Sequence, residues 1–236
     1  MRCLELFAGT GSIGRAFERL GWEVVSLDID PKCSPTHVAD IRDWDYRIYP
    51  RDHFDFIWAS PVCTHYSIAR TSGGPRDLIS ADRLVRRTLD IMDYFNCHWA
   101  FENPQSGLLK SREIVKGLPF FDTSYCRYDY QYRKTTRIWS SLALCLRRPC
   151  SPSDPCAAMV GKRHPKTAQQ SRRGCDKNDT ANTCSQRELY SIPPSLCDDI
   201  ANAANVALTQ RSHGVSDSPA AGTPPPAPNT FISEVL

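Results

Sequence analysis

The chain has 236 residues, of which 41% are hydrophobic and 23% charged, an ordinary balance that excludes disorder of the whole chain. No apolar run approaches the ~18 residues of a membrane span, and the N-terminus lacks the basic start and long apolar stretch of a secretory signal. The net charge of +3 says little about partners. The 11 cysteines, an odd number, indicate reduced thiols in an intracellular compartment rather than a disulfide scaffold.

Strand and helix signals alternate along the first 140 residues. After the first apolar run and a glycine turn, a helix is expected to begin near Ser12 and to carry Ile13, Phe17 and Leu20 on one side. A second, amphipathic helix is expected over 80–95. The expected strands are 3–8, 23–30, 54–60 and 98–104. This alternation predicts βαβ units and an α/β fold with a mostly parallel, doubly wound sheet, whose ligands would bind at the carboxyl ends of the strands.

The first two strands end in residues suited to a nucleoside. Gly9 and Gly11 lie between the first strand and the helix, where they allow close approach of the backbone to a ligand. The turn is neither a P-loop nor a complete dinucleotide motif. Asp28 could accept both hydroxyls of a ribose, Ile29 could pack on a purine, and Asp40 could accept from an adenine amino group. Solvated strand ends would explain each acid separately, but one nucleoside accounts for the whole set.

Reactive side chains follow the third and fourth strands. Cys63 lies just past 54–60 in a proline-stiffened loop and is a candidate nucleophile, although a free cysteine is more often a buried structural thiol. Glu102 and Asn103 end the strand 98–104, where Glu102 would face the same cleft as Cys63. Arg137 leads into a further apolar run.

These motifs together resemble the DNA cytosine-5 methyltransferases. FAGTG resembles the S-adenosylmethionine motif of that family, SPVCTHYS its Pro-Cys loop, ENP its Glu-Asn motif and RKTTRIW its arginine motif, in the order of the family across residues 3–140. SQRELYSIPPSLCDDIANA resembles the segment near the family's end. The departures are Val62 in place of a second proline, Pro104 after Glu-Asn, and the over-spaced Gln131, Arg133 and Arg137. They look like those of small, divergent phage- or virus-type members.

The resemblance implies a Rossmann-like fold and transfer of a methyl group from S-adenosylmethionine to C5 of a cytosine flipped out of duplex DNA. Cys63 would attack C6 as a thiolate, so its pKa is expected to be lowered by nearby positive charge. Glu102 would hold N3 and the exocyclic amine, Arg137 would stabilise charge near O2, and Asn103 would orient the loop. The implied cofactor site consists of Phe7, Gly9, Gly11, Asp28, Ile29, Asp40, Ile41 and Pro61.

Three alternatives stay open at this point. The first is methylation of RNA cytosine, because a basic surface binds either polymer and readout of the 2′-hydroxyl is invisible in sequence. The second is a catalytically inactive nucleic-acid-binding protein, which Val62 and the altered arginine motif allow but Cys63 and Glu102 argue against. The third is methylation of an amino group, where an aromatic side chain is expected at the position of Cys63.

The C-terminal part is organised differently from the core. Residues 133–173 hold ten Lys and Arg against one acid, a net charge of +9 that favours a polyanion-binding surface over a solvated loop. The expected units are a catalytic core at 1–140, a short basic target-recognition insert at 141–185, a segment closing the core at 186–211 and a disordered Pro/Ala-rich tail at 212–236. We expect a monomer with weak or very short sequence specificity.

The basic insert, residues 141–185, is rich in cysteine and histidine. A piece of about 45 residues has too little core to fold alone, and metals commonly supply the deficit. We therefore expect a structural zinc site formed by Cys150, Cys156 and His164, with Cys145 or Cys175 as the fourth ligand. The alternative is a set of free thiols in a surface loop, since the spacing matches no standard zinc finger.

Overall fold

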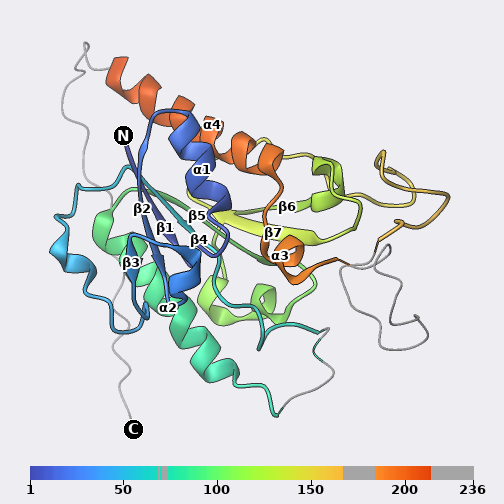
Figure 1. The fold of residues 1–236 in the computed structure, drawn as a ribbon, viewed down its shortest axis with the longest axis horizontal. Helices are drawn as coiled ribbons and strands as arrows, with labels where there is room; N and C mark the ends of the chain where they lie inside the picture. The colour runs from blue at the N-terminus through green and yellow to red at the C-terminus, as the bar shows by residue number, and fades with distance from the viewer. Residues whose placement is uncertain (69, 71–73, 167–183, 214–236) are drawn as a thin grey trace, which may run out of the picture.

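A twisted sheet runs through the centre of the computed structural model, which describes residues 1–68, 70, 74–166 and 184–213 (Figure 1). Within these residues the sheet has seven strands in the order β3-β2-β1-β4-β5-β7-β6. The strands are β1 Arg2–Leu6, β2 Glu23–Asp28, β3 His37–Val38, β4 Phe56–Ala59, β5 His98–Pro104, β6 Phe120–Ser124 and β7 Thr135–Ser140. Strands β1 to β5 pair in parallel, and β7 is antiparallel to both β5 and β6. The expected α/β fold with a mostly parallel sheet is confirmed.

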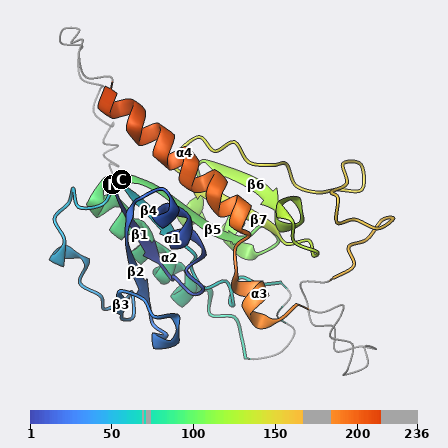
Figure 2. The same ribbon diagram turned by 45° about the horizontal axis from the view of Figure 1, so that its top comes forward.

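Helices cover both faces of the sheet, as a doubly wound fold requires. Helices α1 (Ser12–Arg19) and α4 (Pro194–His213) lie on one face, and α2 (Leu78–Phe95) lies on the other (Figures 1 and 2). The short α3 (Gln186–Tyr190) leads into α4. The short 3₁₀ helices are η1 Pro31–Cys33, η2 Tyr46–Ile48, η3 Leu108–Ser111, η4 Glu113–Val115 and η5 Tyr125–Tyr128.

Two hydrophobic cores follow from this layering. Ile13 and Phe17 of α1 meet Leu196 and Ile200 of α4 in the first core. The second core contains Val85, Met92 and Phe95 of α2. All four residues of the central strand β4 are buried, as expected for a parallel strand covered on both faces.

Two local expectations about the helices are wrong. Helix α2 begins at Leu78, two residues earlier than predicted, because the carboxylate of Asp77 caps it by accepting the backbone N–H of Ser80 at 2.9 Å. Leu20 is the C-cap of α1 and is 39% exposed, so it does not share the buried side with Ile13 and Phe17. Helix α1 does begin at Ser12, as predicted.

The described part of the basic insert comprises residues 141–166, 184 and 185, and its strand pairing is limited to isolated β-bridges, including Ser151–Asp154 and Val160–Arg163. This segment, gold in Figure 1, lies at the end of the sheet that carries β6. The expected disordered tail falls almost entirely outside the described residues. Among the described helices, none is both long and apolar enough to cross a membrane.

Candidate active site

The turn after β1 has an unusual backbone. Phe7, Gly9 and Gly11 all adopt left-handed conformations, with φ of 57°, 50° and 64°. Glycine tolerates this conformation, but a phenylalanine there is strained, and such strain concentrates at functional sites. Asp28 at the end of β2 holds the turn, since it accepts the N–H of Gly9 at 2.8 Å and that of Asp30 at 2.9 Å. The structure therefore joins the glycine turn and Asp28 in one cradle.

Beneath this turn lies Glu5, a residue that sequence reasoning did not single out. Its carboxylate is 3% exposed and accepts the N–H of Ile13 at 3.2 Å in the first turn of α1. Burial raises its pKa to about 7, although hydrogen bonds from Ile13 and Gly14 oppose the rise. A Cβ on Gly14 would lie 2.6 Å from Glu5 Oε2, so the helix can approach the carboxylate only with glycine there. The sequence signal that could have identified Glu5 is an acidic residue inside an otherwise apolar strand.

The other residues of the expected cofactor site lie nearby along the same edge of the sheet. Ile29 is 65% exposed just past β2, as a residue that packs on a ligand would be. Asp40 is paired with Arg42, whose Nη2 lies 2.5 Å from Asp40 Oδ2, and these hydrogen bonds lower the pKa of Asp40 below its usual range. The side chain of Ile41 is buried in the second core.

The nucleophile loop, residues 60–67, follows β4 and is anchored at both ends. Near its start, Asn103 Nδ2 donates to the carbonyl of Pro61 at 2.8 Å. Near its end, Tyr66 is fully buried and its hydroxyl donates to Asp82 Oδ1 at 2.8 Å, so Tyr66 supports the loop from below. Cys63 lies between these anchors and is half-buried. The loop is thereby held against the ends of β5 and α2.

Glu102 is 6% exposed, and three donors approach a single one of its oxygens. Thr136 Oγ1 donates to Oε1, the Tyr125 hydroxyl lies 3.4 Å from the same atom, and Lys134 Nζ lies 3.6 Å from it. Oε2 accepts no hydrogen bond from any of the residues that the structure describes. Among the described residues, the protein therefore holds the carboxylate of Glu102 through Oε1 alone.

Arg137, which was expected to stabilise charge near O2 of the base, does not contact Glu102. In the register of the sheet, Arg137 lies opposite Asn103 on one side and Asp122 on the other. Because side chains alternate along a strand, Arg137 points away from the face of Glu102. Its guanidinium instead pairs with Asp122 at 2.7 Å and lies over the ring of Phe120, 3.5 Å from the centroid. Lys134, in the same motif, supplies the cation beside Glu102.

The pKa of Cys63 also differs from expectation. It is raised, first because burial disfavours the thiolate and second because the charge of Glu102 repels it. The charge of Lys134 lowers the pKa but does not offset these two effects. Glu102 and Lys134 are thus the charged side chains that act on the pKa of Cys63.

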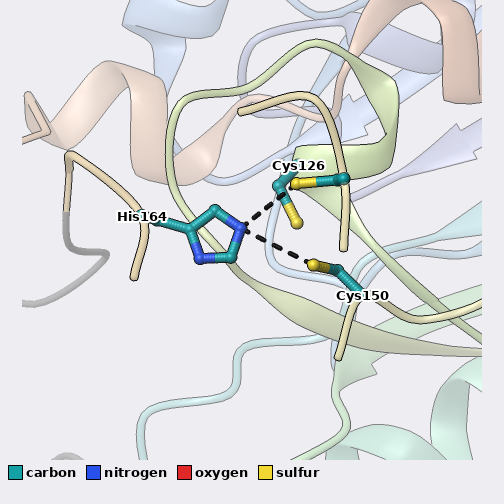
Figure 3. A group of neighbouring side chains, drawn as sticks. Cys126, Cys150 and His164 are labelled. Atoms are coloured by element: carbon teal, nitrogen blue, oxygen red, sulfur yellow. Dashed lines mark hydrogen bonds between the residues drawn. The ribbon is translucent and has the colours of Figure 1, made fainter. Parts of the chain in front are cut away.

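Three of the expected metal ligands come together, and the fourth is different. Cys150, Cys156 and His164 lie with Cys126 in one group, which we call the cysteine cluster. Figure 3 labels three of its members, Cys126, Cys150 and His164. Cys145 is exposed and lies outside this group, so its assignment as a ligand is wrong. Cys175, the other expected candidate, lies outside the described residues. Cys126 belongs to η5, which lies outside the basic insert. A prediction of metal ligands from the cysteines of the insert therefore could not include Cys126.

Comparison with known proteins adds to this geometry. No protein-family model matches the chain. The "Probable DNA (cytosine-5)-methyltransferase" of Frog virus 3 (isolate Goorha) is 30% identical over 214 residues, a match that covers 83% of this chain and 96% of the relative. The chain belongs to the DNA cytosine-5 methyltransferase family. The family deduced from the four ordered motifs is thereby confirmed.

Solved structures with a similar arrangement include methyltransferases. The EhMeth methyltransferase of Entamoeba histolytica aligns with a TM-score of 0.49 and 15% identity over 63% of this chain and 56% of that one. The Dnmt2 methyltransferase of S. pombe aligns with a TM-score of 0.45 and 14% identity over 63% of this chain and 53% of that one. The chain thus spans little more than half the length of these two structures.

Proposed function

We propose that this family member transfers a methyl group to C5 of cytosine in DNA through a covalent bond between Cys63 and C6. The observation that carries the proposal is geometric: the loop of Cys63 follows β4, Glu102 lies near the end of the neighbouring parallel strand β5, Asn103 of β5 holds the loop through the carbonyl of Pro61, and Lys134 Nζ lies 3.6 Å from Glu102. The named activity of the viral relative supports the choice of substrate. The target cytosine would have to be flipped out of the duplex to reach these groups.

The chemistry requires a nucleophile, because C5 of cytosine is itself a poor one. Cys63 Sγ forms a bond to C6, and the electron pair of the C5–C6 double bond becomes available at C5. C5 then takes the methyl group, a base removes the C5 proton, and the Sγ–C6 bond breaks as the double bond re-forms. S-adenosylmethionine, when bound, supplies the methyl group as a sulfonium. The thiolate of Cys63 leaves this cycle unchanged.

Glu102 is suited to hold the base while this happens. Its Oε1 is fixed by Thr136, Tyr125 and Lys134, so Oε2 is the oxygen available to N3 or to the exocyclic amine of cytosine. Binding of the base there would also desolvate the site and strengthen the effect of the nearby cation. Lys134 thus takes the role that the family motif suggested for Arg137.

The cradle around the glycine turn fits the methyl donor. Asp28 offers carboxylate oxygens to ribose hydroxyls, and Ile29 offers an exposed apolar side chain to a purine. Asp40 would accept from the adenine amino group while it remains paired with Arg42. Asn103 acts on the nucleophile loop through the carbonyl of Pro61, which makes it a positioning residue.

The polyanion-binding surface would be smaller than the sequence suggested, since the structure uses several basic side chains internally. Arg137 pairs with Asp122, and Lys166 lies 3.5 Å from Glu188. The basic side chains of the described insert that are exposed are Arg148, Lys162 and Arg163, together with Arg147, which also lies over Tyr128. These residues are the proposed contacts to DNA phosphates.

Trapping of the covalent intermediate tests the proposal. The full chain is incubated with S-adenosylmethionine and a DNA duplex in which 5-fluorocytosine replaces cytosine, because fluorine at C5 prevents release after methyl transfer. We expect a protein–DNA adduct that survives denaturing electrophoresis. Cys63→Ala should abolish the adduct. Cys145→Ala should retain it, because Cys145 is exposed and lies outside both the candidate active site and the cysteine cluster.

Each other outcome has a defined meaning. An adduct formed with the matching RNA but not with DNA would replace the proposed substrate. Binding of the duplex without any adduct on either polymer would overturn the covalent mechanism. An adduct that persists in Cys63→Ala would show that another thiol is the nucleophile.

A further inference from the structure

We infer that a structural zinc ion, bound by Cys126, Cys150, Cys156 and His164, fastens the basic insert to the catalytic core. The four donor atoms all lie within 4.8 Å of one another. Three thiols and one imidazole are a donor set that selects zinc in a tetrahedral site with no open position, which is the form of structural zinc centres.

The two distances from His164 to cysteine sulfurs match those around a tetrahedral ion. His164 Nε2 lies 3.3 Å from Cys156 Sγ and 3.7 Å from Cys150 Sγ; Figure 3 labels His164 and Cys150 and joins them by a dashed line. Ordinary zinc–sulfur and zinc–nitrogen bonds at a tetrahedral angle place the sulfur and the nitrogen about 3.6 Å apart. The same nitrogen faces both sulfurs, so a single ion between them would be shared by all three residues. Neutral imidazole and thiolates are also the forms that bind the metal.

The segment from 150 to 164 has little hydrophobic packing to hold it against the core. The hydrophobic cluster at this end of the molecule consists of Cys126, Cys150 and Cys156, with Ala158 and Met159 packed against them. Such a small cluster cannot offset the conformational entropy of ordering the segment from 150 to 164. Within the described residues, the backbone bridges there join only close neighbours in the sequence, apart from the one between Tyr132 and Lys166. A metal ion supplies the missing stabilisation.

Arg127 complements such a site. A divalent ion with three thiolates and a neutral imidazole carries a net charge of −1. Arg127 lines the same cavity as Cys126 and Cys156, and its Nε is buried without a hydrogen-bond partner among the described residues. Its terminal nitrogens donate to the carbonyls of Asp154 at 2.6 Å and Pro155 at 3.1 Å, between two of the ligands. Arg127 also pairs with the carboxylate of Asp154, with Nη2 2.5 Å from Oδ2, so its positive charge is shared between that acid and the site while its hydrogen bonds hold the loop.

The location of Cys126 gives the ion a second consequence. Cys126 follows Tyr125 in η5, and the Tyr125 hydroxyl contacts Glu102. The ion would therefore tie the insert to the same short helix that supports the active-site carboxylate. This consequence rests on the proposed function, whereas the metal site itself does not.

Metal analysis tests the inference independently of catalysis. The full chain is purified without added zinc or chelator, and its metal content is measured by mass spectrometry. We expect about one zinc per chain. Absence of stoichiometric metal from the wild-type protein would overturn the inference, whatever the result of the DNA-trapping experiment.

Variants then identify the ligands. Cys126→Ser and Cys150→Ser should lose the zinc, Cys145→Ser should keep it, and His164→Cys should keep it in a four-thiolate site. The last variant separates ligation from mere failure to fold. After exchange to Co²⁺, the wild-type protein should show thiolate-to-cobalt charge transfer and the visible bands of tetrahedral cobalt. Zinc retained in Cys126→Ser, or an octahedral cobalt spectrum, would contradict the assigned ligands.

Discussion

Replacement of Glu5 by glutamine should stabilise the protein increasingly as the pH rises. The wild-type carboxyl is buried beneath the glycine turn, where its pKa is raised from 4.5 to about 7. At 1.36 kcal/mol per pKa unit, this difference between the unfolded and folded states corresponds to about 3 kcal/mol. Glutamine keeps the size of the side chain and an oxygen that can accept from Ile13, but it does not ionise in this pH range.

The sign follows from which state holds the proton more tightly. The folded state does, so protonation of Glu5 stabilises the fold fully below pH 4.5, and this contribution is lost as the pH rises toward 7. The wild-type protein should therefore lose about 3 kcal/mol of unfolding free energy across this range through Glu5 alone. Glu5→Gln should not lose it.

Urea denaturation at a series of pH values between about 4 and 8 measures the effect. The informative quantity is the difference in unfolding free energy between wild type and Glu5→Gln, because other titrating groups cancel in it. Glu23→Gln removes the same charge from an exposed position on β2 and serves as the control. A difference that stays constant over the whole pH range would refute the reasoning, since it would mean that Glu5 titrates alike in both states.

Three further predictions follow from the geometry of the site. Lys134→Met should lower kcat by roughly 10²- to 10³-fold, because it removes the cation beside Glu102. Arg137→Met breaks the pair with Asp122, so it should lower the melting temperature and change kcat little. A large loss of kcat in Arg137→Met together with a small one in Lys134→Met would show that Arg137, not Lys134, acts in catalysis. Because the pKa of Cys63 is raised, its alkylation in the absence of substrate, followed by mass spectrometry, should be slower at about pH 8 than that of free cysteine, and faster alkylation would contradict the burial argument. Gly14→Ala should destabilise the fold by about 1–3 kcal/mol, because its Cβ would lie 2.6 Å from a Glu5 oxygen; unchanged thermal stability would show that the carboxylate can move aside.

Local sequence patterns determined much of this protein. The alternation of strands and helices predicted the doubly wound sheet, and Ser12 marked the start of α1 correctly. The motifs could be assigned to one edge because the carboxyl ends of parallel strands lie together, whatever the exact length of each strand. Their order along the chain was also enough to deduce the family. All of these inferences depend on neighbours in the sequence or on rules that hold for every parallel sheet.

Only the tertiary structure decided which side chains meet. Strand β6 was not predicted, because three of its five residues are not buried and its pattern is weak. Because β6 was not predicted, the pairing of Arg137 with Asp122 on that strand could not be predicted either. The register of β7, which places the side chains of Arg137 and Glu102 on opposite faces of the sheet, could not be assigned from the sequence. Cys126 likewise joins the cysteine cluster through packing of η5 against the insert. These contacts join residues that are distant along the chain, and local periodicity carries no information about such pairs.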